Sequence, residues 1–226
     1  MKGIFVALFL ALWSLLFTDC LGQASSQLST VKGTVLLSSN ENTIQMRGRY
    51  GRAQRSNNSK EAGEKTALIW LESTSVSTSS NPEEPVVLDQ KDLSFVPSLL
   101  AVRQNGAVRI RNSDPVYHNV FSLSSVKRFD VGRRPKGEYL DITFDKAGVV
   151  DVFCDIHSNM RAAIYVMSPN VITWTKVKSG EIFSLDNIEP GRYQLKVFAL
   201  GYQERSIPIE VSDGESIDTG TLTLNF

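Results

Sequence analysis

Cysteine and histidine are scarce in this chain of 226 residues, which contains two of each. Cys20 lies in an N-terminal segment that we predict to be removed, so the mature chain would keep Cys154 as its only cysteine. A structural disulfide needs two cysteines, which leaves Cys154 as a free thiol or a metal ligand. A free thiol is prone to oxidation in an oxidising compartment, whereas ligation to a metal protects it.

The chain also lacks an excess of either charge. Lys+Arg and Asp+Glu both number 24, so no global charge points to nucleic acid or to an acidic partner. Long stretches of helical periodicity are absent from the mature region. Short runs of β-branched and aromatic residues between glycines and prolines predict an all-β fold instead. The length suggests one or two domains with a substantial core.

Residues 1–24 have the pattern of a secretory signal peptide. Lys2 supplies the positive start, an apolar run extends from Phe5 to Phe17, and Gly22-Gln23-Ala24 is a small-x-small cleavage site. The run is too short for a comfortable membrane span. The alternative is a lipid anchor at Cys20, which the acidic residue before it disfavours. We therefore predict an exported protein, periplasmic or secreted, with no transmembrane span in the mature chain.

Both histidines and Cys154 lie in two short motifs. The first is His118-Asn119, which follows the turn-forming sequence Asn112-Ser113-Asp114-Pro115. The second is Cys154-Asp155-Ile156-His157-Ser158-Asn159-Met160, directly after a strand-like run whose alternation should point the cysteine inward. One thiolate, two imidazoles and a weak axial thioether are the ligand set of a blue-copper electron-transfer site.

The order and spacing of these residues resemble the cupredoxin family, which includes plastocyanin, pseudoazurin and amicyanin. The resemblance covers residues 85–168, and the short Cys-x-x-His-x-x-Met spacing is most similar to that of amicyanin. It implies that one copper ion is bound by His118, Cys154, His157 and Met160. It also implies that Asn119 ties the two ligand loops together, and that electrons pass to an unidentified redox partner through the edge of His157.

Several alternatives remain open for this site. Zinc also binds one cysteine and two histidines. A zinc enzyme would need an open position and a nearby base, and we expect Asp155 to point away from the metal. Cysteine-protease chemistry would need a geometry that a histidine three residues away does not provide. We therefore expect no enzyme and no catalytic residues. The other functional alternatives are a copper carrier or sensor, and an adhesion or scaffold module whose metal only stabilises the fold.

The C-terminal part resembles a second family. Residues 180–197 and Gly201-Tyr202 are similar to a carboxypeptidase-regulatory-like (transthyretin-like) β-sandwich, which normally begins with Gly-x-Val and Ala-x-Ile-x-Leu strands. Those patterns stand before the copper region, at Gly33-Thr34-Val35 and Ala67–Leu71. Two strands cannot readily bury a core alone. We therefore predict one discontinuous sandwich from residues 28–76 and 169–226, with a cupredoxin-like domain at 85–168 inserted; a tandem arrangement is the alternative.

The segments between these motifs divide into strands and polar stretches. Residues 28–37 and 67–72 are predicted strands, and in the second one Ala67, Ile69 and Leu71 should face opposite to Leu68, Trp70 and Glu72. Residues 40–65 are polar and contain Arg47, Arg49, Arg52 and Arg55. This composition fits a solvated insertion or, alternatively, a basic docking loop. Residues 73–85 have the composition of a linker.

Overall fold

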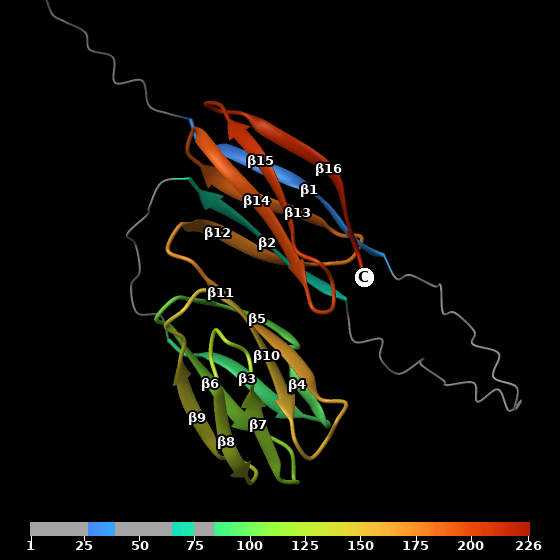
Figure 1. Cartoon of the computed structure of the whole chain (residues 1–226). Helices are drawn as coiled ribbons and strands as arrows, with labels where there is room; N and C mark the ends of the chain where they lie inside the picture. The colour runs from blue at the N-terminus through green and yellow to red at the C-terminus, as the bar shows by residue number, and fades with distance from the viewer. Residues whose placement is uncertain (1–26, 39–64, 75–83) are drawn as a thin grey trace, which may run out of the picture.

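The computed structural model describes residues 27–38, 65–74 and 84–226, which form sixteen β-strands and no helix (Figure 1). The prediction of an all-β fold is confirmed. The predicted signal peptide, the arginine-containing stretch at 40–65 except Lys65, and most of the linker at 73–85 lie outside the described residues. Within the described ranges, no helix could cross a membrane.

The strands β3 to β11 form a unit that we call the inner sandwich. One of its sheets has the order β5-β11-β10-β7-β8, and the other has the order β4-β3-β6-β9. Alternating side chains such as Val108 and Ile110 of β6, and Val150 and Val152 of β10, fill the core between the sheets. The strands are β3 (Val86–Lys91), β4 (Ser94–Val96), β5 (Leu99–Arg103), β6 (Ala107–Asn112), β7 (His118–Ser122), β8 (Phe129–Arg134), β9 (Tyr139–Thr143), β10 (Gly148–Cys154) and β11 (Arg161–Met167).

The remaining strands form the outer sandwich, whose sheets have the orders β13-β1-β16 and β12-β2-β14-β15. Its first two strands precede the inner sandwich in the chain and the other five follow it. Thr34 of β1 lies opposite Ile182 of β13, and Trp70 of β2 lies opposite Trp174 of β12. The strands are β1 (Ser29–Ser38), β2 (Thr66–Ser73), β12 (Val171–Lys178), β13 (Ile182–Ile188), β14 (Gly191–Ala199), β15 (Arg205–Val211) and β16 (Ser216–Asn225).

Strand β2 connects the two sandwiches because both of its faces are buried. Ala67, Ile69 and Leu71 pack into the core of the outer sandwich. Leu68 and Trp70 point the other way, into an apolar cluster shared with the inner sandwich. The alternation of a strand with period two explains this division.

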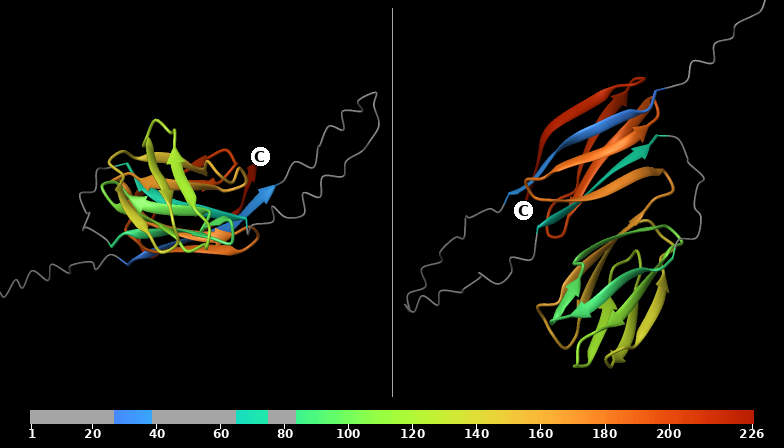
Figure 2. Two further views of the ribbon diagram at one scale, coloured as in Figure 1. Left: turned by 90° about the horizontal axis from the view of Figure 1, so that it is seen from below. Right: turned by 180° about the vertical axis from the view of Figure 1, so that it is seen from behind.

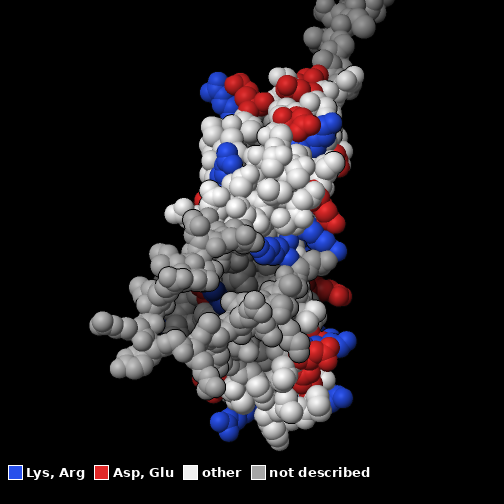
Figure 3. All heavy atoms as spheres, turned by 90° about the vertical axis from the view of Figure 1, so that its right-hand side faces the viewer, with Lys and Arg blue, Asp and Glu red and all other residues white. Residues whose placement is uncertain are grey.

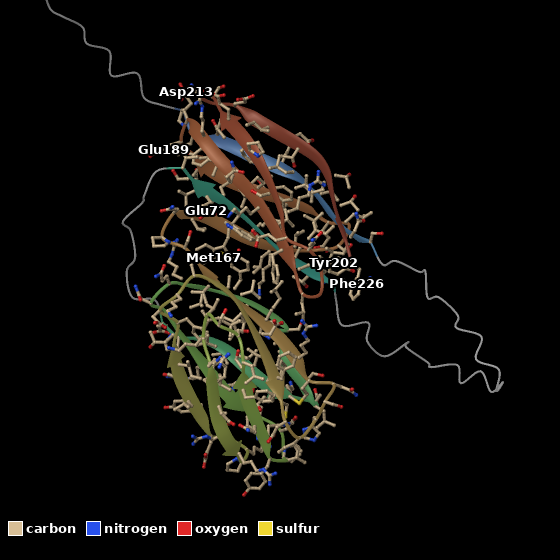
Figure 4. The ribbon with its side chains drawn as sticks, viewed as in Figure 1. Glu72, Met167, Glu189, Tyr202, Asp213 and Phe226 are labelled. Carbon is tan, nitrogen blue, oxygen red and sulfur yellow. The ribbon has the colours of Figure 1, made fainter. Side chains whose placement is uncertain are left out.

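The two sandwiches lie end to end (Figures 1 and 2). They pack against each other through the shared apolar cluster. The ring of Trp70 lies 4.5 Å from that of Tyr165 in β11, centroid to centroid. Figure 4 places Glu72 and Met167 at this junction. The Glu72 carboxylate accepts a hydrogen bond from Ser168 Oγ at 2.7 Å and pairs with Lys196 Nζ at 2.6 Å. This packing fixes the short connection between β11 and β12.

Candidate metal centre

The two ligand motifs meet at one end of the inner sandwich. His118 is the first residue of β7 and Cys154 is the last residue of β10. These strands are antiparallel neighbours, and Cys154 lies opposite Val120. The start of β7 and the end of β10 therefore lie at the same end of the sheet. The loop after Cys154 turns back, because the Met160 amide donates to the His157 carbonyl at 3.0 Å.

Three potential ligand atoms converge at this end. His118 Nδ1 and His157 Nδ1 are 3.1 Å apart, and Cys154 Sγ lies 3.7 Å from the first and 3.8 Å from the second. Tetrahedral zinc with nitrogen ligands at about 2.0–2.1 Å and a thiolate at about 2.3 Å would separate those atoms by roughly 3.3–3.6 Å. The observed spacing is close to these values. The group His118, Cys154 and His157 can therefore hold one metal ion.

The ligands differ in their access to solvent. His118 is completely buried and Cys154 is 5% exposed, whereas His157 is only partly buried. Met160 is 1% exposed and belongs to the same core cluster as Cys154. One imidazole thus reaches the surface while the thiol stays dry. The role of Met160 as a weak ligand stays a prediction.

Asp114 is a component of the site that the sequence did not reveal. Its Oδ2 lies 2.8 Å from His118 Nε2. Because an ionised carboxylate can only accept, it accepts a hydrogen bond from the N–H of Nε2. A histidine that donates through Nε2 keeps the Nδ1 lone pair free for a metal. The sequence pattern predicts only a turn at Asp114. The available signal was its spacing of four residues from His118.

Hydrogen bonds stabilise the ionised form of the Asp114 carboxyl. Burial by itself would raise the pKa of this carboxyl, but hydrogen bonds from the Leu93 amide, the His118 ring and the Asp92 amide outweigh it. The net effect is a pKa below the ordinary value for aspartate. The imidazole therefore faces an ionised carboxylate.

Asn112 fixes the loop that leads to His118. Its side chain is completely buried, and Nδ2 donates to the carbonyls of Val116 and Arg134, both at 2.8 Å. Its Oδ1 accepts from the Asp114 amide at 2.9 Å. These three bonds tie residues 113–117 to the end of β8, so the position of His118 does not depend on its own strand alone.

Asn119 is buried, with 6% exposure, and its Oδ1 has no hydrogen-bond partner in the part of the chain that the structure describes. The predicted tie between the two ligand loops through Asn119 therefore stays a prediction.

Exposed apolar and polar side chains occur in both ligand loops. Ile156 precedes His157 and is 41% exposed. The loop before His118 adds Val116 and Tyr117, which are 42% and 59% exposed. Asp155 is also exposed. On the face of the molecule in Figure 3, side chains of both charges are scattered over both sandwiches.

No family model matches the chain, and no curated protein matches its sequence. The solved structures that it resembles include amicyanins, a copper-containing nitrite reductase and a purple cupredoxin. A mutant amicyanin in its Cu(I) form is 22% identical over 43% of this chain and 99% of its own, with a TM-score of 0.36. The copper-containing nitrite reductase of Thermus scotoductus SA-01 is 23% identical over 42% and 25%, with a TM-score of 0.37. A purple cupredoxin from Nitrosopumilus maritimus is 18% identical over 36% and 99%, with a TM-score of 0.34.

The expectation that the chain is not an enzyme is wrong as a conclusion. It rested on the need of a zinc enzyme for an open position with a nearby base, and on a cysteine–histidine spacing that does not suit a protease. The matched structures nevertheless include an enzyme, the nitrite reductase. Others are amicyanins. The matches do not settle whether this chain catalyses a reaction.

Proposed function

We propose that this chain is an exported protein that binds one copper ion and transfers single electrons. The observation that carries the proposal is the convergence of His118 Nδ1, His157 Nδ1 and Cys154 Sγ within 4.8 Å of one another. One thiolate with two imidazoles is the donor set of a blue-copper centre, and Met160 would be its weak fourth ligand. Copper, when bound, would supply one-electron chemistry between its Cu(I) and Cu(II) states.

The residues of the chain would keep the site rigid during this exchange. Asp114 holds the ring of His118, and Asn112 holds the loop before it. The thiol lies at the end of a strand that is paired on both sides. Ligands that are held in place move little between oxidation states, which suits rapid electron transfer.

The proposed site of electron exchange is the accessible edge of His157. His157 is partly buried, Ile156 next to it in the chain is exposed, and the loop that leads to His118 exposes Val116 and Tyr117. Electron-transfer complexes bury small interfaces, which suits brief contact with a redox partner protein at these loops.

The domain limits belong to the same proposal. We place a signal peptide at residues 1–24, a cupredoxin-like domain at 85–168, and a discontinuous carboxypeptidase-regulatory-like sandwich at 28–76 and 169–226. The pairing of β1 with β13 and β16, and of β2 with β12 and β14, supports the discontinuous arrangement over a tandem one. The outer sandwich would then serve as a docking or spacer unit.

A copper carrier or sensor is the second candidate. The partial exposure of His157 favours it, because an accessible ligand can be exchanged for one from an acceptor.

Voltammetry and copper transfer distinguish the two candidates. For an electron carrier we expect a reversible one-electron wave, and copper that stays bound for hours in the presence of a competing chelator. Transfer of the copper to the chelator within seconds, without a reversible wave, would instead identify a carrier. Tight binding of zinc with no redox response would leave only the structural role. His157→Gly should open the site and accelerate release, whereas Asp155→Asn in the same loop should not.

A further inference from the structure

The turn between β3 and β4 lies outside both ligand motifs. Lys91 and Ser94 pair across the hairpin, so Asp92 and Leu93 form a two-residue loop. Both have positive φ, 54° and 56°. This is the signature of a type I′ turn, which usually carries Asn-Gly or Asp-Gly. A leucine at this position is unfavourable unless other interactions hold it.

Burial does not explain this conformation. Leu93 is 51% exposed, so its side chain gains little from packing. The turn is held instead by its backbone: the Asp92 amide donates to Asp114 Oδ1 at 2.7 Å, and the Leu93 amide donates to Asp114 Oδ2 at 3.0 Å. Asp114 lies 21 or 22 residues further along the chain. The two amides fix the plane of a carboxylate that is only 5% exposed.

The same carboxylate contacts a ligand, since Oδ2 also accepts from His118 Nε2 at 2.8 Å. We propose that the Asp92–Leu93 turn is a remote part of the metal centre, which orients the Asp114 carboxylate and through it the ring and tautomer of His118. Asp114 and the turn are positioning residues and not ligands. The inference rests on the proposed function in one respect, namely that His118 binds the metal through Nδ1.

Two turn variants separate this role from a general effect on the hairpin. Asp92→Asn with Leu93→Gly keeps the type I′ turn and both amide donors. Asp92→Gly with Leu93→Ser favours a type II′ turn, in which the central peptide is flipped and the amide of residue 93 points away from Asp114. In a Cu(II) titration against a competing chelator, the first variant should match the wild type within about twofold. The second should bind at least about tenfold more weakly, as is typical when a ligand loses its supporting partner.

A second readout needs no metal. Nitrogen-15 NMR at about pH 9, where an ordinary imidazole is neutral, reports which ring nitrogen of each histidine carries the proton. In the wild type and the type I′ variant, His118 should carry it on Nε2. In the type II′ variant and in Asp114→Asn, a substantial fraction should move to Nδ1. Asp89→Asn is the matched control, because Asp89 is a neighbouring carboxylate whose bonds go to Arg111 and Ser113 and not to His118.

The outcomes separate the two proposals. If the type II′ variant keeps wild-type copper affinity and the wild-type tautomer of His118, the turn has no positioning role and the inference is wrong. If Asp114→Asn fails to fold, the comparison of the type I′ and type II′ turn variants alone tests the inference. If the wild type forms no thiolate–copper centre while the tautomer changes as expected, the positioning role stands and the proposed function fails.

Discussion

The two sandwiches differ in what they bury. The core of the outer sandwich consists of apolar and aromatic side chains. Of the eight polar residues buried in the described part of the chain, only Ser29 belongs to the outer sandwich. The other seven belong to β3, β6, β7 and the loop between β6 and β7; they are Asp89, Gln90, Asn112, Asp114, His118, Asn119 and Ser122.

Burying polar groups costs free energy unless they are hydrogen-bonded. In the inner sandwich, the buried polar residues lie on β3, β6, β7 and the β6–β7 loop. These segments lead to the end of the sandwich where Cys154, His118 and His157 converge. Local departures from an apolar core are expected at functional sites. The outer sandwich has no such concentration among its described residues, so the difference assigns stability to one region and chemistry to the other. Mutations in each should therefore separate stability from metal binding.

The largest effect on stability should come from the outer core. Phe183 is 2% exposed there, and Phe183→Ala should lower the free energy of unfolding by about 3–5 kcal/mol. Urea denaturation would measure this loss. Copper affinity of the folded variant, measured at low temperature, should remain at the wild-type value. A tenfold loss of copper affinity would contradict the view that the outer sandwich contributes only stability.

A smaller loss, combined with a change at the metal centre, is expected from Asn112→Ala. The substitution leaves the Val116 and Arg134 carbonyls and the Asp114 amide without their partner. We expect a cost of about 2–4 kcal/mol and weaker copper binding. Asn119→Ala is the matched comparison, because Asn119 Oδ1 already lacks a partner among the described residues. Equal costs from the two substitutions would contradict this account of the buried network.

Mutation of Glu72 at the junction between the sandwiches should give the smallest loss of stability, and this loss should depend on pH. Burial would raise the pKa of Glu72, but hydrogen bonds from Lys196 and Ser168 hold it below the ordinary value of 4.5. The ionised form therefore stabilises the fold above about pH 4.5, and this contribution disappears as the pH falls through the lowered pKa.

Glu72→Gln should lower the free energy of unfolding by about 1–2 kcal/mol at pH 7 and by less at pH 3. Urea titrations at both pH values test this. Glu210→Gln is the control, because its ion pair with Arg192 is exposed and long, at 3.6 Å. An undiminished loss at pH 3 would mean that the charge of Glu72 does not stabilise the junction.

The parts of the fold that follow local patterns could be predicted. The alternation in β2 predicts which side chains enter each core, and the spacing of Cys154 and His157 predicts that they lie close together. The role of Asp114 was harder to predict. Its spacing of four residues from His118 is a weak signal in a loop, and its bonds to the β3–β4 turn join residues 21 and 22 positions apart, which leaves no periodic pattern in the sequence. The contact between Trp70 and Tyr165 could not be predicted from the sequence either, because it depends on how the two sandwiches pack.

The most direct test of the central claim is the visible and EPR spectrum of the purified mature protein after addition of Cu(II). The account predicts an intense thiolate-to-copper band and one copper per chain, with the band absent in Cys154→Ser. A wild-type protein without this band, or a Cys154→Ser variant that keeps it, would contradict the assignment of His118, Cys154 and His157 as a copper centre.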